Sequence, residues 1–251
     1  MAQMYLTLPS NSSEKYFPDN TLSHFTTRLH MPIRLPPGEW EVGLAEIQYP
    51  HSWLTIRNRP EARIGVYFLD RDGKAVKKEN EHIDYGFYKS LQELVDALNA
   101  EVGRYVTFKL EKNSQQISAV VKERHMIELS AALQEITMLP QYLQNDYPRI
   151  GHVMANTRRG IDSIYVYCDL VEHQLVGDTQ VPLLRIVPVK GNIGESIAKT
   201  FNHIQYLAVR GGEAIQTVEI EMRDDIGRPI TFENGRVVVV LHLRKIQFPY
   251  L

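Results

Sequence analysis

Apolar residues that alternate with other residues at a period of two are the feature that most limits what this chain can fold into. The alternation is clearest at positions 164, 166, 168 and 170, and again at 218, 220 and 222. A period of two places apolar side chains on one face of a β-strand, whereas a helix needs a period of about 3.6. Further strand candidates are 40–44, 64–68, 106–110, 117–121, 183–189 and 236–243. We therefore expect a chain built mostly of sheet.

Turn residues and one shift in the alternation predict how these strands are connected and where one of them is irregular. The alternation that begins at Trp40 slips by one position at Ala45-Glu46, which predicts a β-bulge. Asp72-Gly73 and Asn113-Ser114 are turn dipeptides that predict two hairpins. Residues 236–243 are apolar at nearly every position, which favours a central strand in one of two stacked sheets.

Only two segments have the pattern of a helix. Ser90 is placed to cap the first, Glu93 completes a capping box, and Gly103 occupies the position of a left-handed C-terminal cap. Ser130 begins a second, shorter helix that stops before Pro140. Two helices among eight or more short strands indicate an all-β sandwich or barrel with one or two inserted short helices, rather than alternating β-α-β layers.

The first 38 residues combine large apolar side chains with Pro, Ser, Asn and Thr. They are too apolar for a solvated tail and too broken by prolines for a regular pair of strands. We expect an extended N-terminal docking arm, residues 1–38, and one sandwich domain, residues 39–251, with a helical insert near 90–140. The alternative is that the arm packs on its own sandwich. Candidate partner-interface residues in the arm and in the similar C-terminal end are Tyr5, Leu6, Tyr16, Phe17, Phe25, Phe248 and Tyr250.

Composition argues against several classes of protein. A net charge of −2 on 251 residues provides no field that would draw the chain onto phosphates or anionic lipid, so we expect no sequence-specific nucleic acid as partner. The single cysteine, Cys168, excludes an internal disulfide and fits folding in a reducing compartment. The start lacks the pattern of a signal peptide, and no stretch approaches the ~20 apolar residues of a membrane span.

Motifs that carry catalysis or metal binding are missing from the sequence. It has no Gly-x-Ser-x-Gly motif, and Cys168 lies in the apolar phase of a strand, which is typical of a buried, inert thiol. The nine histidines include no pair at the i, i+4 spacing of a helical metal site. Residues 70–73 lack the ligands of a calcium loop, and Asp224-Asp225 fits a solvated turn better than a catalytic pair. We predict no enzyme, no cofactor and no metal.

Several blocks of the sequence together resemble one protein family. They are residues 5–13 (YLTLPSNSS), 16–20 (YFPDN), 40–53 (WEVGLAEIQYPHSW), 176–178 with 182–185, and 223–225 with 240–244. In these blocks the chain is similar to the minor capsid, or penton, proteins of Polinton (Maverick) elements and their adintovirus-like relatives, which are virus-like DNA transposons. The resemblance implies a single jelly-roll β-sandwich of eight strands that assembles as a homopentamer at the vertices of an icosahedral shell.

The same resemblance implies partners and a location. The neighbours of such a pentamer are capsomers of a double jelly-roll major capsid protein. Such a protein would be made and assembled inside the host cell and would reside in the virion. No catalytic residues are implied.

Two other functions stay open from the residues alone, because sandwiches serve many unrelated roles. A jelly-roll carbohydrate-binding or adhesion module would use an exposed aromatic platform, for which Tyr85, Phe87 and Tyr88 are candidates. A cupin-like enzyme would need clustered His and Glu ligands inside the barrel.

Overall fold

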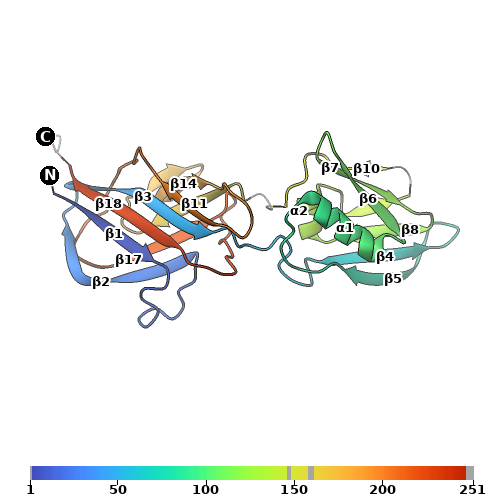
Figure 1. Ribbon diagram of the computed structural model, residues 1–251, viewed down its shortest axis with the longest axis horizontal. Coiled ribbons are helices and arrows are strands. Elements are labelled where there is room, and N and C mark those ends of the chain that lie inside the picture. The colour runs from blue at the N-terminus through green and yellow to red at the C-terminus, as the bar shows by residue number, and fades with distance from the viewer. Residues whose placement is uncertain (1, 146–147, 158–160, 247–251) are drawn as a thin grey trace. The chain divides into compact units, whose positions relative to one another are not determined.

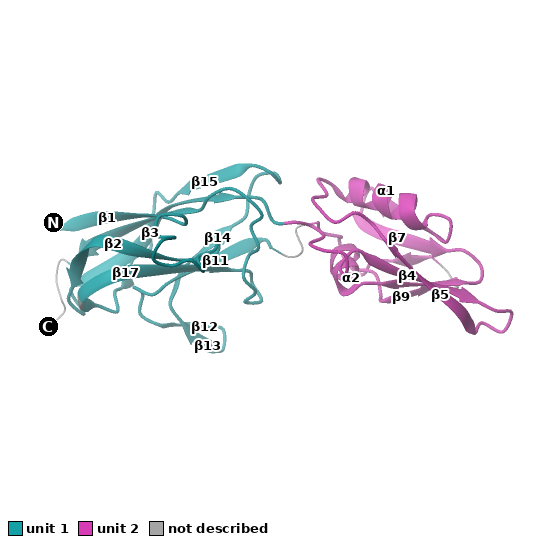
Figure 2. Ribbon diagram, turned by 90° about the horizontal axis from the view of Figure 1, so that it is seen from below, with its two compact units in different colours: residues 1–53, 161–251 teal, residues 54–160 magenta. Residues whose placement is uncertain are grey.

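The computed structural model describes residues 2–145, 148–157 and 161–246. The chain divides into two compact units (Figure 2): unit 1 contains Met1–Trp53 and Ile161–Leu251, and unit 2 contains Leu54–Gly160. Strands dominate both units, and the described residues are all-β apart from two helices, as the periodicity predicts.

Unit 1 is a sandwich of two sheets (Figure 1). Strands of the first sheet are, in spatial order, β1 (Gln3–Pro9), β18 (Val238–Lys245), β3 (Trp40–Pro50) and β15 (Ser196–Thr200), with the short β16 (Leu207–Ala208) also on β3. Strands of the second sheet are β14 (Leu183–Pro188), β11 (Ser163–Cys168), β17 (Gly212–Arg223) and β2 (His24–Leu35). In chain order, a small hairpin of β12 (Gln174–Val176) and β13 (Thr179–Val181) follows β11 and precedes β14.

The order of these strands identifies the architecture. Along the chain, β1, β2, β3 and β11 alternate between the first and the second sheet. The next four strands, β14, β15, β17 and β18, alternate between the second and the first sheet. Eight antiparallel strands connected in this way across two sheets form a jelly roll. The fold that the sequence resemblance implies is therefore confirmed.

The apolar phase of each strand faces the space between the two sheets. On β3 and β18, Leu44 pairs with Leu241 and Glu46 pairs with Val240, so Ala45 is the extra residue of the bulge that the phase slip predicts. Strand β18 lies between β1 and β3, which is the central position that its apolar pattern favours. The inward residues of β11 and β17 are all buried: Ile164, Val166, Cys168, Val218, Ile220 and Met222.

The N-terminal segment differs from the arm that its composition suggests. Residues 3–9 form β1, which pairs with β18, and residues 24–35 form β2, which pairs with β17. These two stretches pack on their own sandwich, which was the alternative interpretation. The prolines are compatible with this pairing because Pro9 ends β1, and Pro32 lies in β2 at the edge of its sheet, where a missing N–H costs no ladder bond.

Unit 2 is inserted between β3 and β11 and is richer in strands than the helical insert expected near 90–140. One sheet has the order β5 (Ala75–His82), β4 (Arg63–Leu69), β8 (His125–Leu129), β9 (Tyr142–Gln144), and the other has the order β10 (Arg149–Ile150), β7 (Gln116–Val121), β6 (Val106–Glu111). The hairpins predicted at Asp72-Gly73 and Asn113-Ser114 join β4 to β5 and β6 to β7. Helices α1 (Leu91–Val102) and α2 (Ala131–Thr137) pack on a core separate from that of unit 1.

The caps of the helices are partly those predicted. The side chains of Ser90 and Ser130 cap α1 and α2 by accepting hydrogen bonds from the N–H groups of Glu93 and Leu133. Gly103 is a correction: its φ of −59° is right-handed, and α2 instead ends on a left-handed residue, Met138, with a φ of 57°. In the part of the chain that the structure describes, neither helix has the length and apolar character needed to cross a membrane.

Candidate functional site

Tyr5 and Leu6, the first two candidate interface residues, alternate between the faces of β1. Tyr5 is 60% exposed on the outer face of the first sheet, whereas Leu6 is half-buried and packs against the core of unit 1. Tyr5 is therefore available to a partner, and Leu6 belongs mainly to the sandwich.

Tyr16 and Phe17 lie in the turn segment between β1 and β2. The N–H groups of both residues donate to Ser13 O, at 2.9 and 3.0 Å. Tyr16 is 60% exposed, and the guanidinium of Arg28 lies 4.4 Å from the centroid of its ring. A cation–π contact at an exposed site contributes only modestly, about 0.5–1 kcal/mol, and here it leaves most of the Tyr16 ring at the surface.

Phe25 corrects the expectation that it contacts a partner. Its side chain is 1% exposed and belongs to the core of unit 1, where β2 pairs Phe25 with Ile220 of β17. Composition could not distinguish it from Tyr16, because both are aromatic residues in one proline-containing segment. The C-terminal candidates, Phe248 and Tyr250, lie outside the described residues.

An aromatic cluster on the outer face of the first sheet was not found from the sequence. The ring of Tyr5 stacks on His242 at a centroid distance of 4.4 Å, and Tyr206 OH lies 2.6 Å from His242 Nδ1. Arg244 lies over the Tyr206 ring at 3.5 Å and forms an ion pair with Glu41. Burial lowers the pKa of His242, and the nearby Arg244 lowers it further, so the imidazole is neutral at physiological pH.

Gly43 makes room for this cluster. It pairs with His242 across the sheet, and a Cβ at this position would lie 2.4 Å from Ile204 Cγ2 and 2.5 Å from Gln205 O. The backbone of residues 204–206 therefore crosses the outer face directly over Gly43 and places Tyr206 beside His242. No local spacing signals this arrangement, because its members come from four separate segments of the chain.

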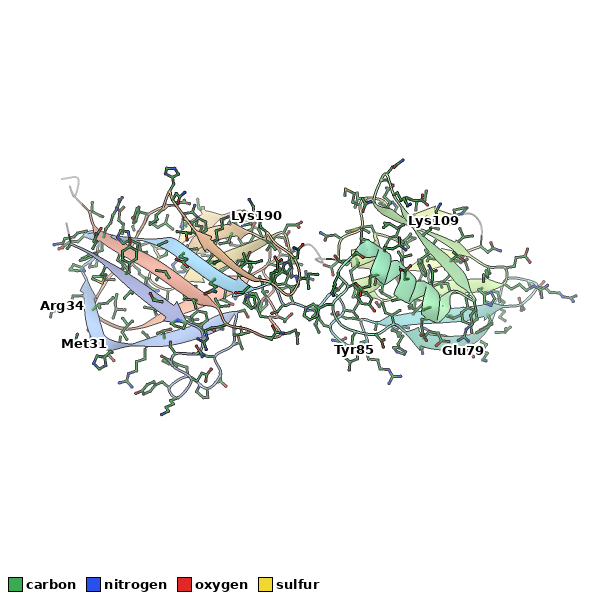
Figure 3. All side chains as sticks on the ribbon, in the orientation of Figure 1. Met31, Arg34, Glu79, Tyr85, Lys109 and Lys190 are labelled. Atoms are coloured by element: carbon green, nitrogen blue, oxygen red, sulfur yellow. The ribbon has the colours of Figure 1, made fainter. Side chains whose placement is uncertain are left out.

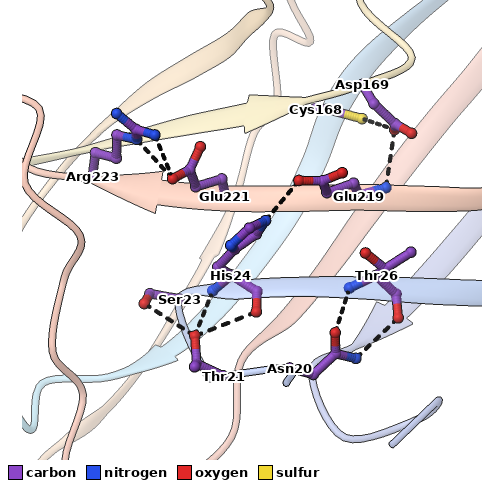
Figure 4. Close-up of polar contacts among 10 residues, drawn as sticks. All are labelled: Asn20, Thr21, Ser23, His24, Thr26, Cys168, Asp169, Glu219, Glu221 and Arg223. Atoms are coloured by element: carbon purple, nitrogen blue, oxygen red, sulfur yellow. Dashed lines mark hydrogen bonds and ion pairs between the residues drawn. The ribbon is translucent and has the colours of Figure 1, made fainter. Parts of the chain in front are cut away.

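Acidic side chains line the outer face of the second sheet (Figure 4). His24 Nε2 lies 2.6 Å from Glu219 Oε1, and Arg223 forms an ion pair with Glu221 at 2.7 Å. Asp169 Oδ1 accepts a hydrogen bond of 2.9 Å from the N–H of Glu219. We call Asp169, Glu219 and Glu221 the carboxylate face; all three line an open hollow of about 230 Å³, which Arg210 also lines.

Three basic side chains lie at the edge of the sandwich formed by β14, an edge strand of the second sheet, and β15, an edge strand of the first sheet. The guanidinium of Arg185 lies 3.9 Å from the centroid of the Phe201 ring, and Lys199 Nζ lies 5.2 Å from the same centroid. Lys190 lies in the loop between the two strands and is labelled in Figure 3. Burial lowers the pKa of Lys199, and the positive charges of Lys190 and Arg185 lower it further. We call Arg185, Lys190 and Lys199 the basic edge.

The aromatic platform considered for a glycan-binding module is only partly exposed. Tyr85, labelled in Figure 3, is 63% exposed and Phe87 is 37% exposed, but Tyr88 is 6% exposed. The hydroxyl of Tyr88 donates to Asp84 O at 2.5 Å, and burial raises its pKa to about 12. Tyr88 is thus a structural residue and offers no ring to a ligand.

The residues considered for chemistry have structural surroundings. Cys168 is 1% exposed, and burial raises the pKa of its thiol, as the apolar phase of the strand predicts. Asp224 corrects the expectation of a solvated turn: it is 3% exposed, accepts from the N–H groups of Ile226 and Arg228, and pairs with the Arg228 side chain. Within the described ranges, no group of three or more His, Cys, Asp or Glu residues could hold a metal ion.

No family model matches the sequence, and no curated protein matches it. Among solved structures, the mavirus penton protein superposes with a TM-score of 0.52 at 12% identity, over 98% of this chain and 100% of that chain. The two chains share one fold. Because the match covers 98% of this chain, it includes the inserted unit 2 as well as the jelly roll.

A structure of the Sputnik virophage also matches, with a TM-score of 0.49 at 11% identity, over 97% of this chain and 98% of that chain.

Proposed function

We propose that this chain is a penton, the subunit that occupies the vertices of an icosahedral capsid, in a virus-like element of the Polinton type. The observation that carries the proposal is the end-to-end match of its jelly roll and inserted unit to the mavirus penton protein. The sequence blocks that resemble Polinton minor capsid proteins support the same function independently of the coordinates. The function is structural, and no catalytic step is part of it.

A ring of five copies requires a heterologous interface, in which one side of a subunit meets a different side of the next. Tyr5 and Tyr16 support such an interface because each exposes 60% of a large aromatic side chain in unit 1. Burial of apolar area at such contacts contributes about 25 cal/mol per Å². Aromatic anchors of this kind suit a chain whose net charge is only −2, since the whole molecule exerts no strong field on a partner.

The proposal extends to neighbours and location. The pentamer would contact capsomers of a double jelly-roll major capsid protein, and the mature protein would reside in the virion after assembly inside the host cell. Phe17, which is half-buried beside Tyr16, would add to the contact with these neighbours.

Native mass spectrometry of the purified full chain, combined with negative-stain imaging, tests the proposal. We expect a species of five copies and ring-shaped particles. A glycan array serves as the control for the adhesion function. A chain that stays monomeric at every concentration tested, or one that selects a glycan while staying monomeric, would contradict the penton function.

A further inference from the structure

The basic edge carries positive charge that the described residues do not neutralise. Its members make no ion pair with the residues that the structure describes: Arg185 donates to the backbone oxygen of His203 at 3.2 Å and otherwise packs on Phe201, as Lys199 does. Three cations placed together repel one another, and burial of Arg185 and Lys199 adds to the cost of charging them. Such an arrangement is stabilised when an anionic group is brought against it.

The carboxylate face has the opposite imbalance. Asp169 forms no ion pair with any described residue; burial raises its pKa, and the adjacent Glu219 carboxylate raises it further. Among the described residues, the Glu219 carboxylate pairs with the imidazole of His24 and with no Lys or Arg side chain. Glu221 is paired with Arg223, and Arg210 also lines the hollow. In the described part of the chain, however, no Lys or Arg side chain forms an ion pair with Asp169 or Glu219.

The charge of unit 1 as a whole indicates what could bind to the basic edge. Unit 1 contains 12 of the 28 Lys and Arg residues and 16 of the 30 Asp and Glu residues, a net charge of −4. Its basic edge is therefore a local exception on an acidic unit. A second copy of unit 1 is an acidic partner that is present whenever the protein is concentrated. Its carboxylate face places three carboxylates around one hollow, and two of them have no Lys or Arg side chain in contact among the described residues.

We propose that the basic edge of one copy docks on the carboxylate face of the next copy, and that this contact sets the register of the ring. The inference rests on the ring assembly given under the proposed function. It assigns the contact to Arg185, Lys190 and Lys199 on one side and to Asp169, Glu219 and Glu221 on the other.

The two surfaces have positions that suit a closed ring. The basic edge is at the side of the sandwich where β14 and β15 are the outermost strands of their sheets. The carboxylate face lies on β17 and on Asp169, the residue directly after the end of β11. An edge and a face of one sandwich point in different directions, so the contact is heterologous and propagates from copy to copy by rotation. The opposite charges would fix the orientation and specificity of the contact, while exposed aromatic side chains would supply the apolar area that becomes buried.

Charge reversal with rescue tests this contact. Lys190 and Glu219 are chosen because both are exposed, so Lys190→Glu and Glu219→Lys should fold, which circular dichroism checks. Lys74→Glu and Asp72→Lys, at the exposed hairpin turn of unit 2, are matched controls with the same changes of charge. The readout is the concentration at which half of the protein is in rings, measured by native mass spectrometry or sedimentation.

We expect each single variant to raise that concentration by about tenfold or more, because like charges then face each other across every interface. The variant that combines Lys190→Glu with Glu219→Lys should assemble nearly as the wild type does, since opposite charges face each other again. Both control variants should behave as the wild type. Added salt should weaken the rings of the wild type and of both control variants alike, because it screens the same opposite charges across each interface.

Other outcomes overturn the inference. Rings that persist unchanged in both single variants, or a combined variant no better than the singles, exclude this contact while leaving the penton function intact. Loss of binding to heparin or DNA by Lys190→Glu, without any change in ring formation, shows that a polyanion is the partner of the basic edge. Absence of rings in the wild type itself counts against the proposed function, and against this contact with it.

Discussion

Tyr5 of β1 and His242 of β18 stack with ring centroids 4.4 Å apart, and the tyrosine is the outer ring of the two. Tyr5 is 60% exposed, whereas His242 is 6% exposed. One exposed aromatic side chain therefore shields a buried imidazole, and under the proposed function it would also present a surface to another subunit.

Replacing Tyr5 by alanine should move the titration of His242. Because the folded-state pKa of His242 lies below its ordinary value of 6.5, the unfolded chain binds the proton more readily. The free energy of unfolding contributed by this group therefore falls as the pH drops through 6.5. Tyr5→Ala admits water to the ring, so the pKa of His242 should rise toward 6.5 and this acid sensitivity should shrink. NMR titration of the His242 ring protons measures the change.

Thr7→Ala is the matched control for Tyr5→Ala, because Thr7 is exposed on the same strand. It should leave the His242 titration unchanged. Equal shifts in both variants would show that β1 itself is perturbed and that stacking is not the cause.

Glu128 in unit 2 should contribute stability that depends on pH. Lys78 Nζ lies 2.7 Å from its carboxylate and Arg63 lies 3.3 Å from it, while the Glu128 side chain is 9% exposed. The hydrogen bond from Lys78 and, after it, that from Arg63 lower the pKa of Glu128 from 4.5 to about 2 despite burial. The stabilisation is present above pH 4.5 and is lost as the pH falls toward 2.

Glu128→Gln should therefore destabilise unit 2 at pH 7 by roughly 1–2 kcal/mol, a value reduced because Lys78 is partly exposed to solvent. At pH 2 the variant and the wild type should be alike. Hydrogen exchange of the β4 and β8 amides at both pH values measures the difference, with Glu123→Gln, at an exposed position, as control. A loss of the same size at pH 2 would contradict an origin in the ionised carboxylate.

Gly43→Ala should disturb the outer face of the first sheet. The added Cβ would meet Ile204 Cγ2 and Gln205 O, so residues 204–206 must move and Tyr206 must separate from His242. We expect a loss of about 1–3 kcal/mol in unfolding free energy, measured by urea denaturation. Adding Ile204→Ala should recover only part of it, because the backbone oxygen of Gln205 still blocks the methyl group. Full recovery would show that only the side chain of Ile204 matters.

Cys168 should be inert toward thiol reagents in the native protein. Its side chain is 1% exposed, and burial raises the pKa of the thiol, so little thiolate is present near pH 8. The reagent DTNB should react with one thiol per chain in guanidinium chloride and with almost none in buffer. Fast labelling of the native protein would indicate that β11 opens readily.

Features that depend on neighbours along the chain follow from the sequence. The strands and their inward faces, the bulge at Ala45, the hairpin at Asp72-Gly73 and the cap at Ser90 are all present as predicted. Each arises because a side chain's period or a turn residue's backbone preference acts within a few residues. The resemblance of the sequence blocks added the jelly roll, which local patterns alone did not distinguish from other sandwiches or barrels.

Tertiary structure decided everything that depends on strand partners. Whether Phe25 is buried depends on the pairing of β2 with β17, and the covering of His242 depends on Tyr5 and Tyr206 from distant segments. The division into two units, the basic edge and the carboxylate face have the same origin. The physical reason is that antiparallel sheets join residues far apart in sequence, so burial and charge proximity are set by which strands pair, and a composition or a period of two does not specify that pairing.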